Sequence, residues 1–245
     1  MKIKQMMELP QFPLPLEGVR GRLLYEDNHI IAVNKNSSEI VQGDKTGDKP
    51  LSEILKSYIK EKYNKPGEVF LGVTHRLDRP VSGVVLFART SKSLTRLNEM
   101  FRTKEVEKTY WAIVQNRPKE PEGRLEHYLI RNEKQNKSFA YHTEKPNSKK
   151  AVLTYKLIAS SDRYHLLEVN LETGRHHQIR CQLAAMGCPI KGDLKYGSPR
   201  SNPNGGISLH ARSVAFIHPV SKEYIHIVAP VPEDEKLWMA FGIDK

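Results

Sequence analysis

The 245-residue sequence contains little cysteine and no long hydrophobic run. Its two cysteines, Cys181 and Cys188, are seven residues apart, a spacing typical of neither a disulfide framework nor a zinc site. We expect both to be reduced packing residues. No apolar stretch approaches the length of a membrane span, and the segment from Met1 to Gln5 lacks the apolar core of a signal peptide. These absences predict a cytoplasmic protein without membrane association.

Acidic residues are fewer than basic residues. The sequence contains 28 Asp and Glu and 39 Lys and Arg, which gives a formal net charge of +11. A polyanionic partner is therefore expected, and nucleic acid is the first choice, because Lys and Arg that neutralise phosphates release condensed counterions. The alternative is that the excess charge only keeps the protein soluble.

The pattern of apolar residues predicts an α+β fold. Residues 1–20 are rich in Pro and Met, have no clear period and predict an N-terminal arm before one domain of residues 21–245. Strands and helices alternate without regular βαβ repetition, which favours a mixed, largely antiparallel sheet with flanking helices and a cleft across the sheet. The predicted strands are 23–26, 29–35, 69–73, 84–87, 108–115, 152–157, 165–171, 209–218 and 224–228, the predicted helices are 51–63, 91–102 and 178–186, and a polar hairpin at 118–150 is expected to reach away from the core.

One acid in a basic setting is the main candidate for chemistry. Asp78 lies in a turn between two apolar runs, with Arg76 and Arg79 beside it. Sheets present functional residues on such loops. A lone carboxylate among arginines either clamps those arginines or takes part in a reaction.

A second polar cluster, residues 172–180, leads from a strand through Gly174 into a helix. Helix starts expose free amide donors, so this cluster predicts phosphate or carboxylate binding. Arg180, in the first turns of the helix, is expected to form a bidentate pair with Asp78 and hold it ionised. An ordinary ion pair that links two loops is the alternative.

The adjacent His176 and His177 do not predict a metal site. Neighbours on a helix point about 100° apart, unlike an i, i+4 pair that grips one ion. No carboxylate-rich set accompanies them. We therefore expect no bound metal.

Several motifs, in this order, resemble those of the RluA-type pseudouridine synthases. The resemblance covers about residues 23 to 230, and four separate motifs in one order are hard to meet by chance. It implies isomerisation of uridine to pseudouridine in structured rRNA or tRNA, with no metal and no organic cofactor. The four motifs are His75-Arg76-Leu77-Asp78 with Ser82-Gly83, Lys108-Thr109-Tyr110, Thr173 through Arg180, and Gly192-Asp193 with Tyr196-Gly197. The late segment Leu209-His210-Ala211 is similar to the family pattern as well.

The resemblance implies a catalytic role for three residues. Asp78 would be the catalytic carboxylate, which either attacks ribose C1′ or removes the C2′ proton to give a glycal. Arg180 would supply the cation that offsets the desolvation of this carboxylate. Tyr110 would stack on the uracil, and its hydroxyl could help to move the C5 proton. A tyrosine in a core strand is the alternative for Tyr110.

The other matching residues would bind the RNA. Arg76 would fill the space that the flipped base vacates, since a planar cation can stack and contact phosphate. Ile179 would form an apolar wall beside the uracil, and Lys108 would be a scaffold or phosphate contact. Arg175 would also bind RNA, and His75 and His177 would be hydrogen-bonding scaffold.

Two departures from the family pattern bear on target choice. The segment from Lys35 to Ile40 lacks the usual Lys-Pro-x-Gly turn, which affects the shape of that loop. Residues 1–20 are too few for the small RNA-binding domain of many relatives. We therefore expect a monomer that recognises RNA through its catalytic domain, 21–245, with residues 117–150 as the candidate surface.

Two other functions remain open from the residues alone. A non-catalytic RNA-binding or ribosome-assembly factor could have the same fold and basic surface, although binding phosphate gives no reason for an acid in the cleft. An RNA hydrolase that uses His176 and His177 would need a positioned partner acid, which the sequence does not offer.

Overall fold

The computed structural model describes residues 15–242. Most of the expected N-terminal arm, residues 1–14, lies outside this range. The last six residues of the arm form a short helix, α1 (Pro15–Arg20), which lies against α2 (Leu51–Lys62). The expectation of an irregular segment is wrong for these six residues.

The described strands form one mixed sheet of eleven strands. Nine follow the order β1-β2-β4-β10-β5-β9-β8-β6-β7, while β3 pairs with β4 and β11 pairs with β10. Within residues 15–242, only β4 and β10 pair in parallel, so the prediction of an α+β fold with a largely antiparallel sheet is confirmed. The strands are β1 (Leu23–Glu26), β2 (Ile30–Lys35), β3 (Gly72–Val73), β4 (Ser82–Ala88), β5 (Glu107–Val114), β6 (Glu122–Asn132), β7 (Lys137–Tyr141), β8 (Lys149–Ser160), β9 (His165–Leu171), β10 (Leu209–Ile217) and β11 (Tyr224–Val228).

The sheet forks where β4 meets β10. The two strands pair only at Ser82 with His210 and at Gly83 with Ala211. Beyond this point β4 pairs with β3, and β10 pairs with β11. Gly83 has φ 117°, and a Cβ there would lie 2.7 Å from the Cα of Ala211, so only glycine permits this close crossing. The loop before β4, which carries Asp78, is therefore fixed beside the middle of the sheet.

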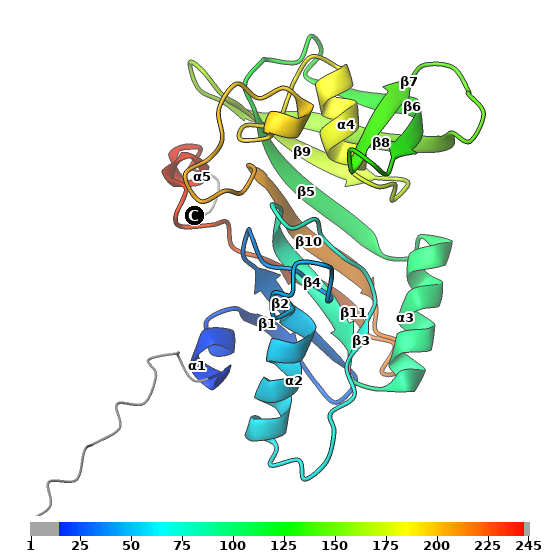
Figure 1. The fold of residues 1–245 in the computed structure, drawn as a ribbon, viewed down its shortest axis with the longest axis vertical. Helices are drawn as coiled ribbons and strands as arrows, with labels where there is room; N and C mark the ends of the chain where they lie inside the picture. Colours follow the sequence, from blue (N-terminus) through cyan, green and yellow to red (C-terminus); the bar gives the residue numbers. More distant parts are fainter. Residues whose placement is uncertain (1–14, 243–245) are drawn as a thin grey trace, which may run out of the picture.

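Helices cover the sheet in two halves (Figure 1). In the lower half of the view lie α2 and α3 (Ser91–Thr103), with β1 to β4 and β11. In the upper half lie α4 (Gln178–Ala185) and the 3-10 turn η1 (Leu194–Tyr196), over β6 to β9. A short helix α5 (Lys236–Ala240) follows near the C-terminus. Within residues 15–242, no helix is both long and apolar enough to cross a membrane.

Local sequence signals locate most elements well. The 3.6-residue period places α2, α3 and α4 within one residue of their observed ends, and the β1–β2 hairpin turns between the predicted strands 23–26 and 29–35. The N-cap of α3 is Thr90, whose hydroxyl accepts the Ser93 N–H at 3.1 Å. Cys181 and Cys188 are free and buried, as expected.

The polar segment at 118–150 does not reach away from the core. It supplies β6, β7 and the first residues of β8, which pair side by side at one end of the sheet. Leu129 and Ser138 are buried in this segment, and Leu129 packs in one cluster with Cys181 of α4. The hairpin prediction is correct for the β6–β7 pairing and wrong for its position, because the alternate residues His127 and Leu129 of β6 are buried against α4.

Candidate active site

Asp78 lies on the loop between β3 and β4, and a buried lysine supports that loop. Lys35, at the end of β2, is fully buried, and its ammonium group donates to the carbonyl oxygens of Arg79 at 3.1 Å and Val81 at 2.6 Å. Its third bond, at 2.9 Å, goes to the Asn36 carbonyl. Burial lowers the pKa of Lys35 to about 8. These bonds fix the backbone immediately after Asp78.

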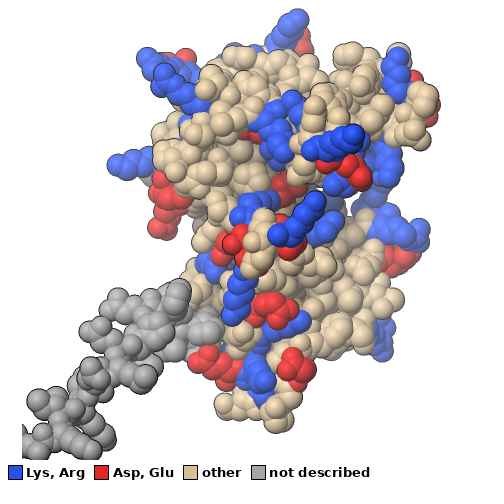
Figure 2. Space-filling model, viewed as in Figure 1, with Lys and Arg blue, Asp and Glu red and all other residues tan. Residues whose placement is uncertain are grey.

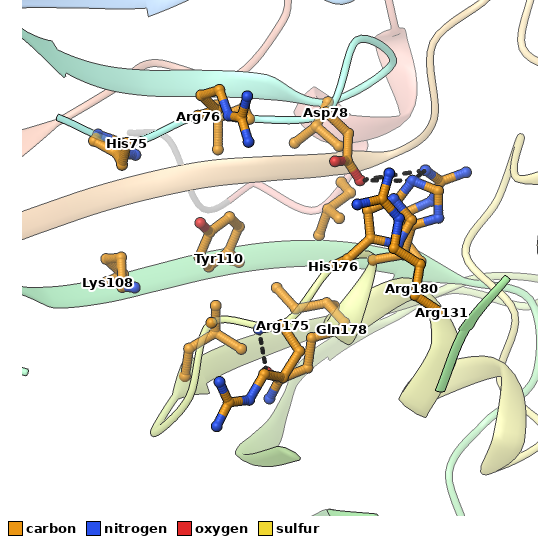
Figure 3. A pocket seen from close by; sticks show the side chains of 17 residues that line it. His75, Arg76, Asp78, Lys108, Tyr110, Arg131, Arg175, His176, Gln178 and Arg180 are labelled. Carbon is orange, nitrogen blue, oxygen red and sulfur yellow. Dashed lines mark hydrogen bonds and ion pairs between the residues drawn. The ribbon is translucent and has the colours of Figure 1, made fainter. Parts of the chain in front are cut away.

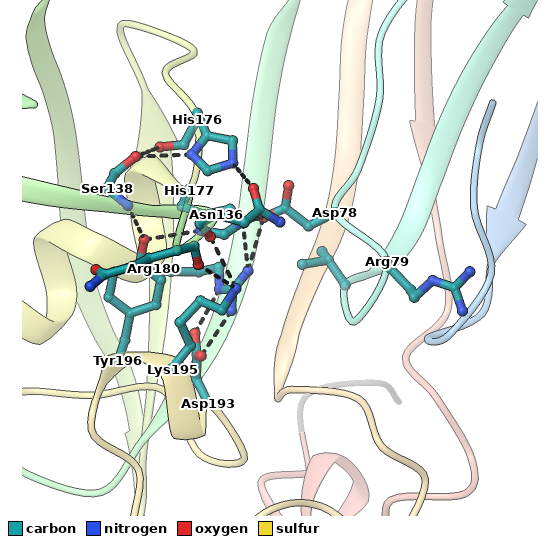
Figure 4. Close-up of polar contacts among 12 residues, drawn as sticks. Asp78, Arg79, Asn136, Ser138, His176, His177, Arg180, Asp193, Lys195 and Tyr196 are labelled. Atoms are coloured by element: carbon teal, nitrogen blue, oxygen red, sulfur yellow. Dashed lines mark hydrogen bonds and ion pairs between the residues drawn. The ribbon is translucent and has the colours of Figure 1, made fainter. Parts of the chain in front are cut away.

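Arg180 approaches Asp78 from the opposite half of the molecule (Figure 4). Its Nε and Nη2 donate to Oδ2 and Oδ1 of Asp193 at 2.7 and 2.9 Å, while its Nη1 lies 3.3 Å from Oδ2 of Asp78. The expected bidentate pair of Arg180 with Asp78 is therefore wrong, since the bidentate partner is Asp193. Burial disfavours the guanidinium charge, but Asp193 outweighs this effect and raises the pKa of Arg180 above its ordinary value.

His177 completes the contact around Asp78 without adding charge. Its Nε2 lies 3.0 Å from Arg180 Nη1 and 3.5 Å from Oδ2 of Asp78. Burial and the Arg180 charge lower the pKa of His177 to about 2, so the ring is neutral near pH 7. A guanidinium can only donate, so Nε2 accepts and Nδ1–H donates to the Tyr196 hydroxyl at 3.0 Å. Arg180 is therefore the charged partner of Asp78 among the described residues.

The loop before α4 contains one residue in a left-handed backbone conformation. His177 is the N-cap of the helix and has φ 53°, in the left-handed region that favours glycine. The loop is held by Gln178, whose side-chain oxygen accepts from the Thr173 hydroxyl at 2.8 Å and the Arg175 N–H at 2.9 Å. These bonds fix the position from which His177 and Arg180 enter the site.

An apolar wall lies next to the carboxylate. Tyr110 of β5, Ile179 of α4 and Leu209 of β10 are all buried and all line one pocket with Asp78. The Tyr110 hydroxyl makes no hydrogen bond within residues 15–242, and Figure 3 shows it pointing into the pocket. Burial and the Asp78 charge raise the pKa of Tyr110, so the hydroxyl is protonated near pH 7. The pocket can hold a flat ring between apolar side chains and one acid.

The opposite end of the pocket carries His75 and Lys108 (Figure 3). His75 Nε2 accepts the Leu86 N–H at 3.0 Å, and burial together with Lys108 lowers its pKa to about 3, so the ring is neutral. Burial also lowers the pKa of Lys108. Arg175 lines the same end, and its Nε donates to the Lys150 carbonyl at 3.0 Å.

The two arginines beside Asp78 behave differently. Arg79 points away from Asp78 (Figure 4), pairs with Asp48 and donates to the Thr46 hydroxyl at 2.9 Å. Arg76 is exposed at the pocket and has no ion pair or hydrogen bond within the described part of the chain. Arg76 is the one of these two that is available to an anion.

The structure brings all nine predicted site residues together in one pocket of about 390 Å³. Arg131, Asp193 and Tyr196 also belong to the site or support it, and the sequence assigned them no role. A buried arginine needs a buried acid, and this requirement could have indicated Asp193. Within residues 15–242, no group of three or more His, Cys, Asp or Glu side chains could hold a metal ion.

Comparison with known proteins gives one consistent family. Residues 29–185 match the model of the RNA pseudouridylate synthase family. The chain is 33% identical over 228 residues to an uncharacterised RNA pseudouridine synthase of Synechocystis sp., covering 92% of this chain and 70% of that one. It is 34% identical over 214 residues to the ribosomal large subunit pseudouridine synthase C of Rickettsia bellii, covering 86% and 68%.

A solved structure supports the same fold. Human RNA pseudouridylate synthase domain containing 4 superimposes with a TM-score of 0.74 at 24% identity, covering 89% of this chain and 91% of that one. The resemblance to the RluA-type enzymes in the sequence motifs is confirmed by these matches. The chain belongs to the RNA pseudouridylate synthase family and is an RNA pseudouridine synthase, an isomerase of uridine in RNA.

Proposed function

We propose that this enzyme isomerises specific uridines in structured rRNA or tRNA in the cytoplasm, with Asp78 as its catalytic carboxylate. The domain of residues 21–245 acts as a monomer and needs no cofactor. One observation carries the proposal: the Asp78 carboxylate faces Arg180 at 3.3 Å and shares its pocket with an apolar wall that includes Tyr110. The name of the Rickettsia relative, a large-subunit enzyme, supports rRNA as the first substrate to test.

The reaction needs a carboxylate in this setting. The target uridine must leave its stack before an enzyme can reach its glycosidic bond. The bond from C1′ to N1 breaks, the base turns over and C5 bonds to C1′; C5 then loses its proton and N1 gains one. Asp78 either attacks C1′ and is later displaced, or takes the C2′ proton and returns it. In both routes the anion must persist in a partly desolvated pocket, and Arg180 offsets that cost.

Tyr110 and Ile179 hold the uracil while it turns. Their buried side chains offer flat and branched apolar surfaces beside Asp78, which suit a ring that must rotate without hydrogen bonds that fix one orientation. The Tyr110 hydroxyl keeps its proton near neutral pH because burial raises its pKa. It therefore relays the C5 proton at the end of the reaction rather than acting as a strong base.

Basic residues at the pocket hold the RNA. Arg76, which has no partner within the described residues, fills the space left by the flipped base. Lys108 and Arg175 contact the phosphates next to the target. His75 and His177 are neutral scaffold: His75 anchors the Asp78 loop to β4, and His177 links Arg180 to Tyr196.

Tritium release from C5 tests this proposal. Transcripts of rRNA and of tRNA labelled at uracil C5 are incubated with the wild-type enzyme and with Asp78→Asn. We expect release from one transcript class with the wild type and none with the variant. Full release by Asp78→Asn would contradict the assigned role. Binding without release from any RNA would favour the non-catalytic RNA-binding alternative.

A further inference from the structure

The pocket that holds Asp78, here called the central pocket, forms the middle of a longer groove. A larger pocket of about 910 Å³, here the flanking pocket, lies between the end of α3, the start of β5 and the loop at residues 170–175. A third, of about 380 Å³, lies beyond Asp78 and is lined by residues 40–44. Neighbouring pockets share wall residues, so the three form one path.

The groove is basic along its length. Figure 2 shows Lys and Arg side chains gathered along the waist between the two halves. The three pockets together are lined by nine Lys and Arg and four Asp and Glu. A single RNA strand, with one phosphate per nucleotide, fits this charge. The groove is therefore suited to hold more of the strand than one nucleotide.

Lys108 stands at the junction of the central and flanking pockets and lines both. Its ammonium group has no ion pair or hydrogen bond within residues 15–242, and it lies over the Phe101 ring, 5.7 Å from the ring centroid. Figure 3 places Lys108 and His75 at the end of the central pocket away from Asp78. A cation at this junction is positioned for the phosphate that joins two adjacent nucleotides.

The walls of the flanking pocket suit a nucleobase. Phe101 and His75 lie ring against ring with centroids 4.8 Å apart, which gives an aromatic surface at one side. On another side the Thr109 hydroxyl donates to Oδ1 of Asn170 at 2.9 Å. This bond fixes the amide and leaves the Asn170 NH₂ group, which is exposed, free to donate to a carbonyl or ring nitrogen of a base.

One of the two acids of the flanking pocket is neutralised by an arginine, and the basic residues of the pocket outnumber both. Glu172 is bound by Arg124, with Nε–Oε1 and Nη2–Oε2 distances of 2.9 and 3.0 Å, so its charge is compensated. Glu107 is exposed and lies beside Lys108 in sequence, without an ion pair among the described residues. Lys104 and Arg175, also exposed, add two positive charges to the same pocket.

We propose that the flanking pocket binds the nucleotide adjacent to the target uridine, with Lys108 on the connecting phosphate and Asn170 on the base edge. The inference rests on the proposed function, because it requires the target uridine in the central pocket. Binding of this adjacent nucleotide makes the enzyme sensitive to the identity of the base next to its target uridine. Such a contact gives sequence preference beyond the target base, which contacts to phosphate cannot supply.

A double-mutant cycle between protein and RNA tests the base contact. The probe is a stem–loop RNA with one loop uridine, prepared intact, with an abasic site 5′ to the uridine, and with an abasic site 3′ to it. Binding is measured for the wild type and Asn170→Ala. We expect the variant to bind the intact RNA about tenfold more weakly, and to match the wild type on one of the two abasic RNAs. An equal loss on all three RNAs, or no loss on any, would overturn the proposal.

The salt dependence of binding tests the phosphate contact. Lys108→Met should reduce the slope of log K against log salt by about 0.7, the value for one phosphate on a single strand. Lys60→Met, which removes an exposed lysine of α2 outside the groove, should leave the slope unchanged. An unchanged slope for Lys108→Met would contradict its place on a phosphate. Tritium release from uracil C5 is measured in parallel. A loss of binding in Asn170→Ala that depends on the neighbouring base, without tritium release by the wild type, would reject the proposed catalysis but not the proposed binding of the adjacent nucleotide.

Discussion

Arg180 and Asp193 form a two-point ion pair beneath the site, with Nε–Oδ2 and Nη2–Oδ1 distances of 2.7 and 2.9 Å. Asp193 is 1% exposed, and the pair uses two of the three nitrogens of the guanidinium. The third nitrogen, Nη1, is left for Asp78 and His177. The buried acid therefore aims Arg180 at the candidate catalytic carboxylate.

Asp193→Asn should destabilise the protein strongly. The variant leaves the Arg180 charge buried without its acid, and breaking a buried pair in this way costs about 3–5 kcal/mol. Urea denaturation measures the free energy of unfolding. Asp48→Asn is the matched control, because its pair with Arg79 is exposed and contributes about 0–1 kcal/mol. Equal losses for the two variants would show that Asp193 has no special role.

Arg180→Lys should reduce turnover although it keeps the charge. An ammonium group cannot bond Asp193 at two points and still face Asp78, so we expect a loss of about 10²-fold in the single-turnover rate. Arg79→Lys, at a surface pair, is the control and should retain nearly full rate. If Arg180→Lys had the wild-type rate, charge alone would suffice and the geometry would not matter.

Lys35→Met should loosen the Asp78 loop. The carbonyls of Asn36, Arg79 and Val81 lose their shared donor, and a buried group left unsatisfied costs about 1–3 kcal/mol. We expect a lower midpoint of thermal unfolding and a lower single-turnover rate, since the backbone after Asp78 loses its anchor. Lys60→Met, at an exposed site on α2, should change neither quantity. A wild-type rate in Lys35→Met would show that the loop keeps its position without this lysine.

Stability should fall as the pH drops below about 6.5. Burial lowers the pKa of His177 to about 2 and of His210 to about 4, whereas in the unfolded chain both take the ordinary value near 6.5. Below that value the unfolded state binds protons that the folded state does not. Each histidine then contributes a loss of about 1.4 kcal/mol per pH unit, which continues for His210 down to about pH 4.

Urea denaturation between pH 7 and pH 5 measures this effect. His210→Gln should reduce the slope of the unfolding free energy against pH by the contribution of about one proton, which is about 1.4 kcal/mol per pH unit. His226→Gln, at an exposed position on β11, is the control and should leave the dependence as in the wild type. Stability that does not change between pH 7 and pH 5 would contradict the neutral, buried state of His177 and His210.

The sequence locates the elements because their signals are local, and its resemblance to the RluA-type enzymes names the nine candidate site residues. Apolar periodicity places α2 to α4, and the motifs around Asp78 and Arg180 name the residues that share the pocket. The bidentate partner of Arg180 is misassigned from the sequence, because that pairing depends on how α4 and η1 pack together in space. Asp193 lies thirteen positions away in sequence but adjacent in space, and it takes Nε and Nη2 of Arg180, which leaves only Nη1 for Asp78.

The position of the 118–150 segment could not be predicted for a similar reason. Its residues are polar enough to suggest an excursion into solvent, yet β6 alternates in burial along its second half, with His127 and Leu129 inside. Only the packing of α4 on this strand reveals which face is covered. The fork of β4 and β10 is likewise set by a contact between Gly83 and Ala211, which are far apart in sequence.

The rate of pseudouridine formation by Asp78→Asn under single-turnover conditions tests the central claim most directly. The amide keeps the size of the side chain but cannot attack C1′ or accept the C2′ proton, so we predict no product with RNA binding within about threefold of the wild type. Lys60→Met, at an exposed site on α2 outside the groove, should convert the same RNA at the wild-type rate. Conversion by Asp78→Asn at the wild-type rate would contradict the catalytic role of Asp78 and move the reaction to another residue of the pocket.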